Sequence, residues 1–383
     1  MGTPGRFQHA ADALVGARPR DAGAPRQGTA AAARRRELGA NVREFGGKLV
    51  AYYLVRLRAQ PRAVRGESDL ASLVVETYRR DPKHTAFLLE RLCYDYVRGL
   101  WRAGRAGEMP RHLLDGQAAA ALPEQSLILL HAGLGMALTE ILLLPLRPDA
   151  PASTFDAALD RFAELVEANS QPAFAAVAFE SLGLMVRRFI PRLHGPVEAR
   201  LRARDARLAA YYWHGAGRAI YFLPGLFHPF PGTARRGLEI CRREPLEPQH
   251  RLDALAGFCF ASTMINLRHP TLVARLLPFL GPGEIEALAS GVAGALLTRH
   301  HTSPDEPAVR EFLRPIAEDL AGPGASPATV LLAGLWEEEV RRPCAAALEH
   351  AYPLLRARGE LASLARHRPL GSLPAPETPE MKE

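Results

Sequence analysis

The feature that most restricts the fold of this chain is a pair of small residues that recurs within three apolar segments. Each pair follows a large ring side chain by two residues, and each segment then continues in apolar residues to a proline. Glycine inside a helix costs roughly 1 kcal/mol relative to alanine. Its recurrence therefore predicts helices whose backbones approach each other closely. The pairs are Gly133/Gly135 in His131–Pro145, Ser181/Gly183 in Phe179–Pro191 and Gly215/Gly217 in Trp213–Pro224.

Two later segments, Asp253–Leu267 and Glu286–Leu297, carry weaker versions of the same pattern. The first three copies are unevenly spaced, by 48 and then 34 residues. No segment alternates apolar and polar residues as a half-buried strand would. We therefore expect an all-α fold, an irregular stack of helical hairpins that is α-solenoid-like or a multi-helix bundle.

The ends of the chain differ in composition from its middle. Residues 1–38 are rich in Arg, Ala and Pro with no apolar period, and residues 367–383 are similar, so we expect both to be disordered tails. Residues 39–366 should form the helical domain, with a sub-boundary near residues 105–122. Of the net charge of +7, the first forty residues hold +4. The body is thus nearly neutral, which does not favour nucleic-acid binding.

Dipeptides with proline mark candidate helix starts. Asp81-Pro82 and Ser326-Pro327 each place a capping side chain before a proline at the first helical position. Ser303 with Glu306 has the spacing of a capping box. We expect a helix to begin at each site, and Pro343 to end the last of them.

The small-residue segments resemble a bacterial family of unknown function whose members occur in enediyne biosynthetic gene clusters. The resemblance is carried by GLGMAL, GAGRAIYF, ALAGFCF and SGVAGALL, and covers about the middle half of the chain. That family has no established reaction. The resemblance therefore implies a setting, bacterial specialised metabolism, and no chemistry. The motif positions are Gly133–Leu138, Gly215–Phe222, Ala254–Phe260 and Ser290–Leu297.

One stripe of polar side chains accompanies the third small pair. Tyr211, His214, Arg218 and Tyr221 are spaced so that they share one side of a helix. They could bind a small acidic or aromatic ligand, with His214 carrying a proton and Glu180 from the preceding segment nearby. The favoured alternative is an amphipathic interface with the polar tips in water.

The stripe is followed by an aromatic, proline-stiffened loop, Leu223–Gly232. Its Phe227, His228 and Phe230 are candidates for contact with a ligand or a partner, because a stiff loop can close over a pocket or present its rings outward. The alternative is a rigid connection that buries its own rings.

Metal and membrane sites are not expected. The chain has no HExxH motif and no Cys/His cluster, and the adjacent His300 and His301 point in different directions on a helix. We expect no cofactor. The most apolar segment, Ser126–Leu146, contains His131 and Glu140, so a buried helix explains it better than a membrane span. Without an apolar leader, we expect a cytoplasmic protein.

The two polar residues of that apolar segment need partners if they are buried. His131 and Glu140 lie on opposite faces of their helix, so they cannot contact each other. We expect their partners among polar side chains of the other repeats, such as Glu180, Arg187 or His214.

Two functions remain open from the sequence. The favoured one is a non-catalytic helical-repeat accessory protein that binds another protein through a groove between hairpins. The alternative is an enzyme or small-molecule-binding protein with a pocket among the repeat helices, lined by His214, Arg218 and Tyr221. No catalytic motif is present, so the sequence leans against an enzyme.

Overall fold

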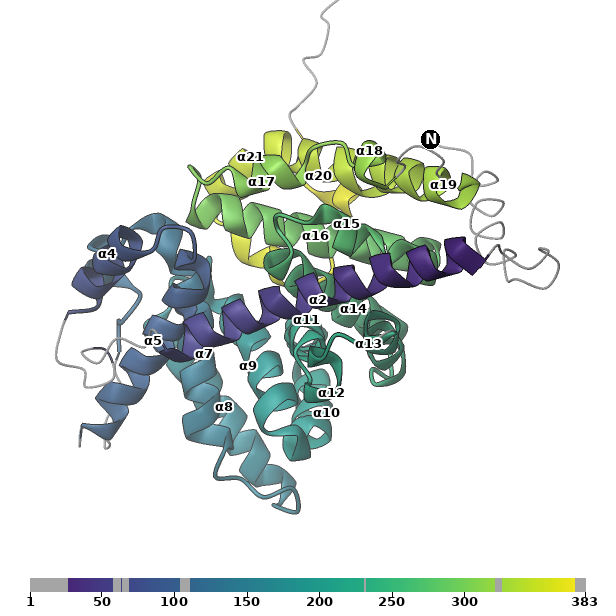
Figure 1. Ribbon diagram of the computed structural model, residues 1–383. Helices are drawn as coiled ribbons and strands as arrows, with labels where there is room; N and C mark the ends of the chain where they lie inside the picture. Colours follow the sequence, from purple (N-terminus) through teal and green to yellow (C-terminus); the bar gives the residue numbers. More distant parts are fainter. Residues whose placement is uncertain are drawn as a thin grey trace, which may run out of the picture.

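Six apolar helices that pack side by side in chain order form the centre of the molecule (Figure 1). The computed structural model describes residues 27–57, 63, 69–103, 111–230, 232–320 and 326–375. Within these ranges the chain is helical, with no strand beyond one isolated bridge between Leu114 and Ser170. The expected all-α fold is confirmed. The central helices are α5 (Thr85–Arg102), α7 (Leu127–Leu143), α9 (Ala175–Phe189), α11 (Ala206–Tyr221), α14 (Pro248–Ile265) and α16 (Pro282–Thr302).

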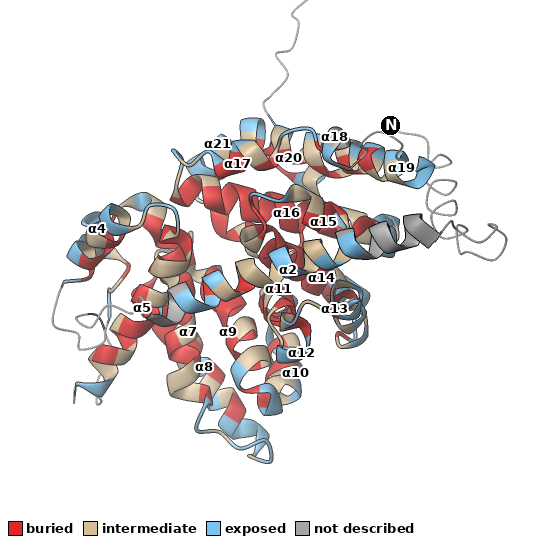
Figure 2. Cartoon of the chain, viewed as in Figure 1, coloured by how far each residue is buried: buried red, intermediate tan, exposed pale blue. Residues whose placement is uncertain are grey.

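Other helices connect successive central helices on the outside, so that hairpins alternate along the array. Helices α8, α10 and α13 make these connections, and α2 crosses the array (Figure 1). The central helices are largely buried, whereas the connecting helices expose one side (Figure 2). The bounds are α2 (Gln27–Leu57), α4 (Leu70–Arg80), α6 (Gly116–Ala120), α8 (Ala152–Asn169), α10 (His194–Arg204), α12 (Pro224–Phe227), α13 (Thr233–Arg243), α15 (Pro270–Ala274), α17 (Ala308–Phe312) and α18 (Ala317–Leu320).

The glycines of the central helices lie against the backbones of their neighbours. A Cβ atom at Gly215 would lie 1.7 Å from the carbonyl oxygen of Glu180, and one at Gly183 would lie 1.9 Å from that of Tyr212. Such separations leave no room for any side chain. Close helix–helix approach is therefore the reason for glycine here. The same holds for Gly133, Gly135, Gly217, Gly257 and Gly291, each against a backbone carbonyl of the preceding or following central helix.

The last helical segment continues through its proline. Helices α19 (Pro327–Trp336), α20 (Arg342–Ala346) and α21 (Tyr352–Ala357) are joined by π-helical turns at Glu337–Arg341 and Ala347–Ala351. Ser326 caps α19 as expected. The prediction that Pro343 ends this helix is wrong. The π-helical turn before it is wide enough to accommodate the proline ring and the loss of one backbone N–H donor.

The two other predicted helix starts are also wrong. Asp81 ends α4, and α5 begins only at Thr85. Ser303 ends α16, and Glu306 pairs with Arg299 instead of capping α17. At both positions, side chains that the local pattern assigns to helix capping take part in turns or ion pairs instead.

Both tail boundaries differ from the sequence-based expectation. Helix α2 begins at Gln27, so residues 27–38 are helical, consistent with the high helix propensity of Ala, Arg and Leu. His367 is buried, its amide donates to Asp253, and the chain is packed as far as Leu373. Residues 1–26 and 376–383 lie outside the described ranges, as do residues 105–110 of the expected sub-boundary. Buried residues on both sides of that segment belong to one continuous core.

Among the residues that the structure describes, one stretch, Glu124–Leu143, is long and apolar enough to cross a membrane by length and composition. It comprises α7 and the turn before it, and 78% of its apolar window is buried in the protein. Its polar residues are used internally: His131 donates to the Leu127 carbonyl at 2.7 Å, assigned to Nδ1, and Glu140 pairs with Arg98. These partners differ from the expected ones on the other repeats, because each lies within the helix itself or on the adjacent α5.

Replacing Gly215 with alanine should destabilise the protein. The new methyl group would overlap the Glu180 carbonyl, and forcing the helices apart should cost about 2–3 kcal/mol net of the propensity gain. Gly334→Ala is the matched control, since nothing lies within 4 Å of the point that a Cβ would occupy there, and it should stabilise by about 0.5–1 kcal/mol. Urea unfolding measures both; equal effects would contradict close packing at Gly215.

Buried histidines predict acid sensitivity. Burial lowers the pKa of His131, His194 and His367 to about 4. Below about pH 6.5 the unfolded chain therefore binds protons that the folded chain does not, and stability falls with falling pH. Each fully buried neutral histidine contributes a slope of about 1.4 kcal/mol per pH unit.

His131→Leu should therefore reduce the slope of unfolding free energy between pH 6 and pH 5 by about 1.2 kcal/mol per unit. Urea unfolding at several pH values measures this slope. The substitution of His350, an exposed residue, should leave it unchanged. An unaltered slope in His131→Leu would count against a buried neutral imidazole.

Candidate functional site

The polar stripe on α11 divides between two surroundings. His214 and Arg218 face α9 and contact Glu180, which is the grouping that the sequence suggested. Tyr221 instead accepts a hydrogen bond from Asn266. The Lys48 ammonium nitrogen lies over the Tyr221 ring, 3.9 Å from the ring centroid. Tyr211 lies near Arg366. The two tyrosines are therefore not part of the His214 cluster.

A buried ion cluster joins three central helices. Arg218 of α11 donates to Glu180 of α9 at 2.7 Å and to Glu90 of α5 at 3.2 Å. His214 Nδ1 lies 3.3 Å from the other Glu180 oxygen. Glu180 and His214 are each only 1% exposed. The single guanidinium thus bridges two carboxylates on different helices.

Glycine contacts bring this cluster together. The backbone carbonyls of Glu90, Glu180 and His214 lie against Gly133, Gly215 and Gly257, respectively. The polar side chains therefore leave the helices at the level where the backbones are closest. The sequence does not predict Glu90, because its partner is 128 residues away and its own segment carries no distinguishing pattern.

The charges of the cluster follow from burial and from Arg218. Burial would raise the pKa of Glu180, but the Arg218 charge and the His214 hydrogen bond keep it below its usual value. Burial raises the pKa of Glu90, against the effect of Arg218, and lowers the pKa of His214. Glu180 is therefore ionised and His214 neutral near pH 7.

The space beside the cluster is small. A cavity of about 30 Å³ adjoins Glu180, His214 and Arg218. It has room for about one water molecule and not for an organic ligand. The arrangement acts as an ion bridge between helices, and it gives no support to the pocket that the alternative function requires.

The aromatic loop contributes to a second candidate site, on the surface. Rings of α2 and of the loop after α12 form a continuous series with neighbouring centroids between 5.8 and 6.4 Å apart. Phe230 is 64% and Tyr53 52% exposed. We call this series the aromatic surface; in order, its members are Tyr53, Tyr52, Phe227, Phe45, His228 and Phe230.

The base of the aromatic surface is fixed. Lys48 of α2 donates to the Leu226 carbonyl at 3.0 Å and pairs with Glu44 at 3.2 Å. The bond to Leu226 holds α12 against α2, so that segments 178 residues apart present their rings together, and the pair with Glu44 within α2 orients Lys48. Of the sequence candidates, Phe227, His228 and Phe230 lie here. The sequence does not predict that the rings of α2 belong to this site, because the apolar pattern of this N-terminal helix is weak.

Among the described residues, no three His, Cys, Asp or Glu side chains are grouped to hold a metal ion. Comparison of the chain with protein-family models, curated proteins and solved structures gives no match.

Removing one member of the ion cluster should be costly. Arg218→Met leaves the buried Glu180 and the partly buried Glu90 beside each other without a counter-charge, and should destabilise by about 3 kcal/mol. Arg236→Met, at an exposed position, should change stability by less than about 0.5 kcal/mol. Chemical unfolding of both variants measures the difference. Similar stabilities would show that the bridge does not hold the helices.

Proposed function

We propose that this protein is a non-catalytic helical interaction protein that docks a partner on the aromatic surface. The observation that supports this proposal is the continuous series of rings from α2, from α12 and from the loop that follows α12. Aromatic side chains supply large contact areas at low entropic cost and dominate protein interfaces. The site differs from the groove between hairpins that the sequence suggested.

Apolar residues extend this surface along α2. Leu38 and Val42 lie two turns and one turn before Phe45 on the same side of the helix and are exposed by 55% and 50%. Five of the thirteen exposed large apolar residues in the described ranges belong to α2. This concentration favours an elongated apolar partner over a point contact.

The partner we infer is an amphipathic helix with acidic flanks. Its apolar residues, at helical spacing, would follow the stripe from Leu38 to Tyr53. Arg35 lies one turn before Leu38, and Arg188 lies beside Phe189 within electrostatic reach of Tyr52. Acidic residues at the edge of the partner would complement these arginines. In the setting that the sequence resemblance implies, the partner would be a cytoplasmic protein of bacterial specialised metabolism.

A displayed library of helical peptides tests the proposal without knowledge of the partner. Selection against the full chain should enrich peptides with apolar residues at i, i+3, i+4 and i+7 and with acidic flanks. Their affinity should fall at least about tenfold in Tyr53→Glu and in Phe230→Glu, because each places a charge in the contact. Leu246→Glu, at a residue that is exposed elsewhere, should bind as the unaltered chain does.

Two results would overturn the proposal. One is enrichment of peptides whose binding is unaffected by Tyr53→Glu and Phe230→Glu. The other is a self-associating chain, detected by sedimentation, that becomes monomeric in either variant, since a second copy would then be the occupant.

A further inference from the structure

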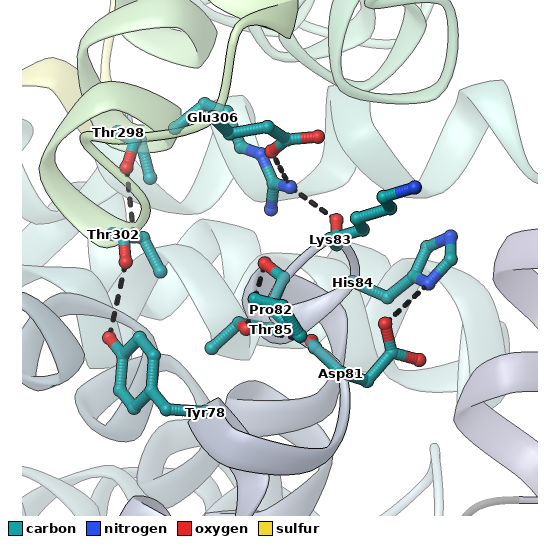
Figure 3. Close-up of polar contacts among 10 residues, drawn as sticks. Tyr78, Asp81, Pro82, Lys83, His84, Thr85, Thr298, Thr302 and Glu306 are labelled. Atoms are coloured by element: carbon teal, nitrogen blue, oxygen red, sulfur yellow. Dashed lines mark hydrogen bonds and ion pairs between the residues drawn. The ribbon is translucent and has the colours of Figure 1, made fainter.

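A second face of α2 borders a cavity of about 450 Å³, a volume within the range of small-molecule sites. Its walls are the inner face of α2, the turn before α5, the end of α14 with the following loop, and the end of α16. Figure 3 shows the turn with Lys83 and His84, and Glu306 across from it.

The lining of this cavity is strongly basic. It contains Arg43, Lys83, Arg268 and Arg299, and Glu306 is the one carboxylate among its described lining residues. Arg299 is buried and is occupied by Glu306 and the Lys83 carbonyl. That pair is neutral, so the lining itself has an excess of three positive charges; the Asp81 carboxylate, which lies outside the lining 2.9 Å from Nδ1 of His84, offsets part of this excess.

The other three lining cations, Arg43, Lys83 and Arg268, are exposed residues. Within the described ranges, none of Arg43, Lys83 and Arg268 has a carboxylate within ion-pair distance. Figure 3 shows the Lys83 side chain leading away from Glu306. Besides burial, the charges of Arg43 and Arg268 lower the pKa of His269, which lies between the same walls. Cations from α2 and from the loop after α14 therefore act on a common space.

The remaining lining suits the rest of a ligand. Phe87, Met264 and Leu267 provide apolar surface, and Gly47 lets α2 lie close against Ile265. The 18-residue helix α5 begins beside Lys83 and His84, so its positive end adds to the field. Guanidinium groups with a helix start form the combination that proteins use to bind phosphate.

We propose that this cavity binds a small phosphate monoester whose apolar or aromatic body packs on Phe87, Met264 and Leu267. Arg43 and Arg268 hold the phosphate oxygens from opposite walls, and Lys83 neutralises the remaining charge. The site is separate from the aromatic surface, and its occupation does not depend on a docked partner. Because Arg43 belongs to α2, the ligand also ties this helix to the array.

Isothermal titration calorimetry of the full chain with phenyl phosphate tests the inference. At about 0.15 M salt, where loose surface pairing is largely screened, we expect saturable one-to-one binding with a Kd of about 1 mM or lower. Arg43→Gln and Lys83→Gln should each weaken it at least about tenfold. Arg358→Gln, which removes an exposed arginine just after α21 without an ion pair, is the matched control.

Inorganic phosphate and phthalate define the ligand class. Inorganic phosphate should bind more weakly than phenyl phosphate, because it lacks the body that packs on the apolar wall. Phthalate, with two carboxylates on a similar ring, should also bind more weakly. The inference is overturned by phthalate binding more tightly than phenyl phosphate, by no saturable binding of phenyl phosphate, or by binding that Arg43→Gln and Lys83→Gln leave intact. Circular dichroism verifies that each variant is folded. Arg43 and Lys83 are both exposed, so we expect their variants to fold.

Discussion

Contact between helix backbones at glycine positions determines how the rest of this protein is arranged. Where Gly215 lies on the Glu180 carbonyl and Gly257 on that of His214, no side chain separates the helices. This fixes the register of α9, α11 and α14, and with it the direction in which each polar residue leaves its helix. The ion cluster of Arg218, Glu180 and Glu90 exists because these contacts bring α5, α9 and α11 to one level.

Much of this arrangement is predictable from local sequence. A glycine pair in an apolar segment costs helix stability, so its recurrence indicates a packing requirement, and the packing found meets that requirement. The grouping of His214, Arg218 and Glu180 follows from helical spacing and adjacency of segments. Glu90 does not, because its place in the cluster depends on α5 lying beside the array after a long intervening chain.

Other features depend on tertiary contacts that local patterns misrepresent. Asp81 and Ser303 have the spacing of helix caps, yet both end helices, and each lies within three residues of a lining residue of the basic cavity in sequence. Glu306 matches a capping box but is paired with Arg299. The start of α2 resembles a tail in sequence because residues 27–38 are rich in Ala and Arg and contain a single large apolar residue, Leu38, which is exposed. Local rules also fail away from these sites, at Pro343 and at the packed segment around His367.

The separation of α9 and α11 can be measured directly in solution. In a deuterated protein with protonated glycine, nuclear Overhauser contacts should connect the Gly215 α-protons with the amide proton of Leu184, whose nitrogen would lie 2.8 Å from a Cβ at Gly215. Equivalent contacts should connect Gly257 with the backbone of α11. If the chain is folded and helical but these cross-peaks are missing, a layer of side chains separates the helices, and the account of the fold and of the ion cluster is wrong.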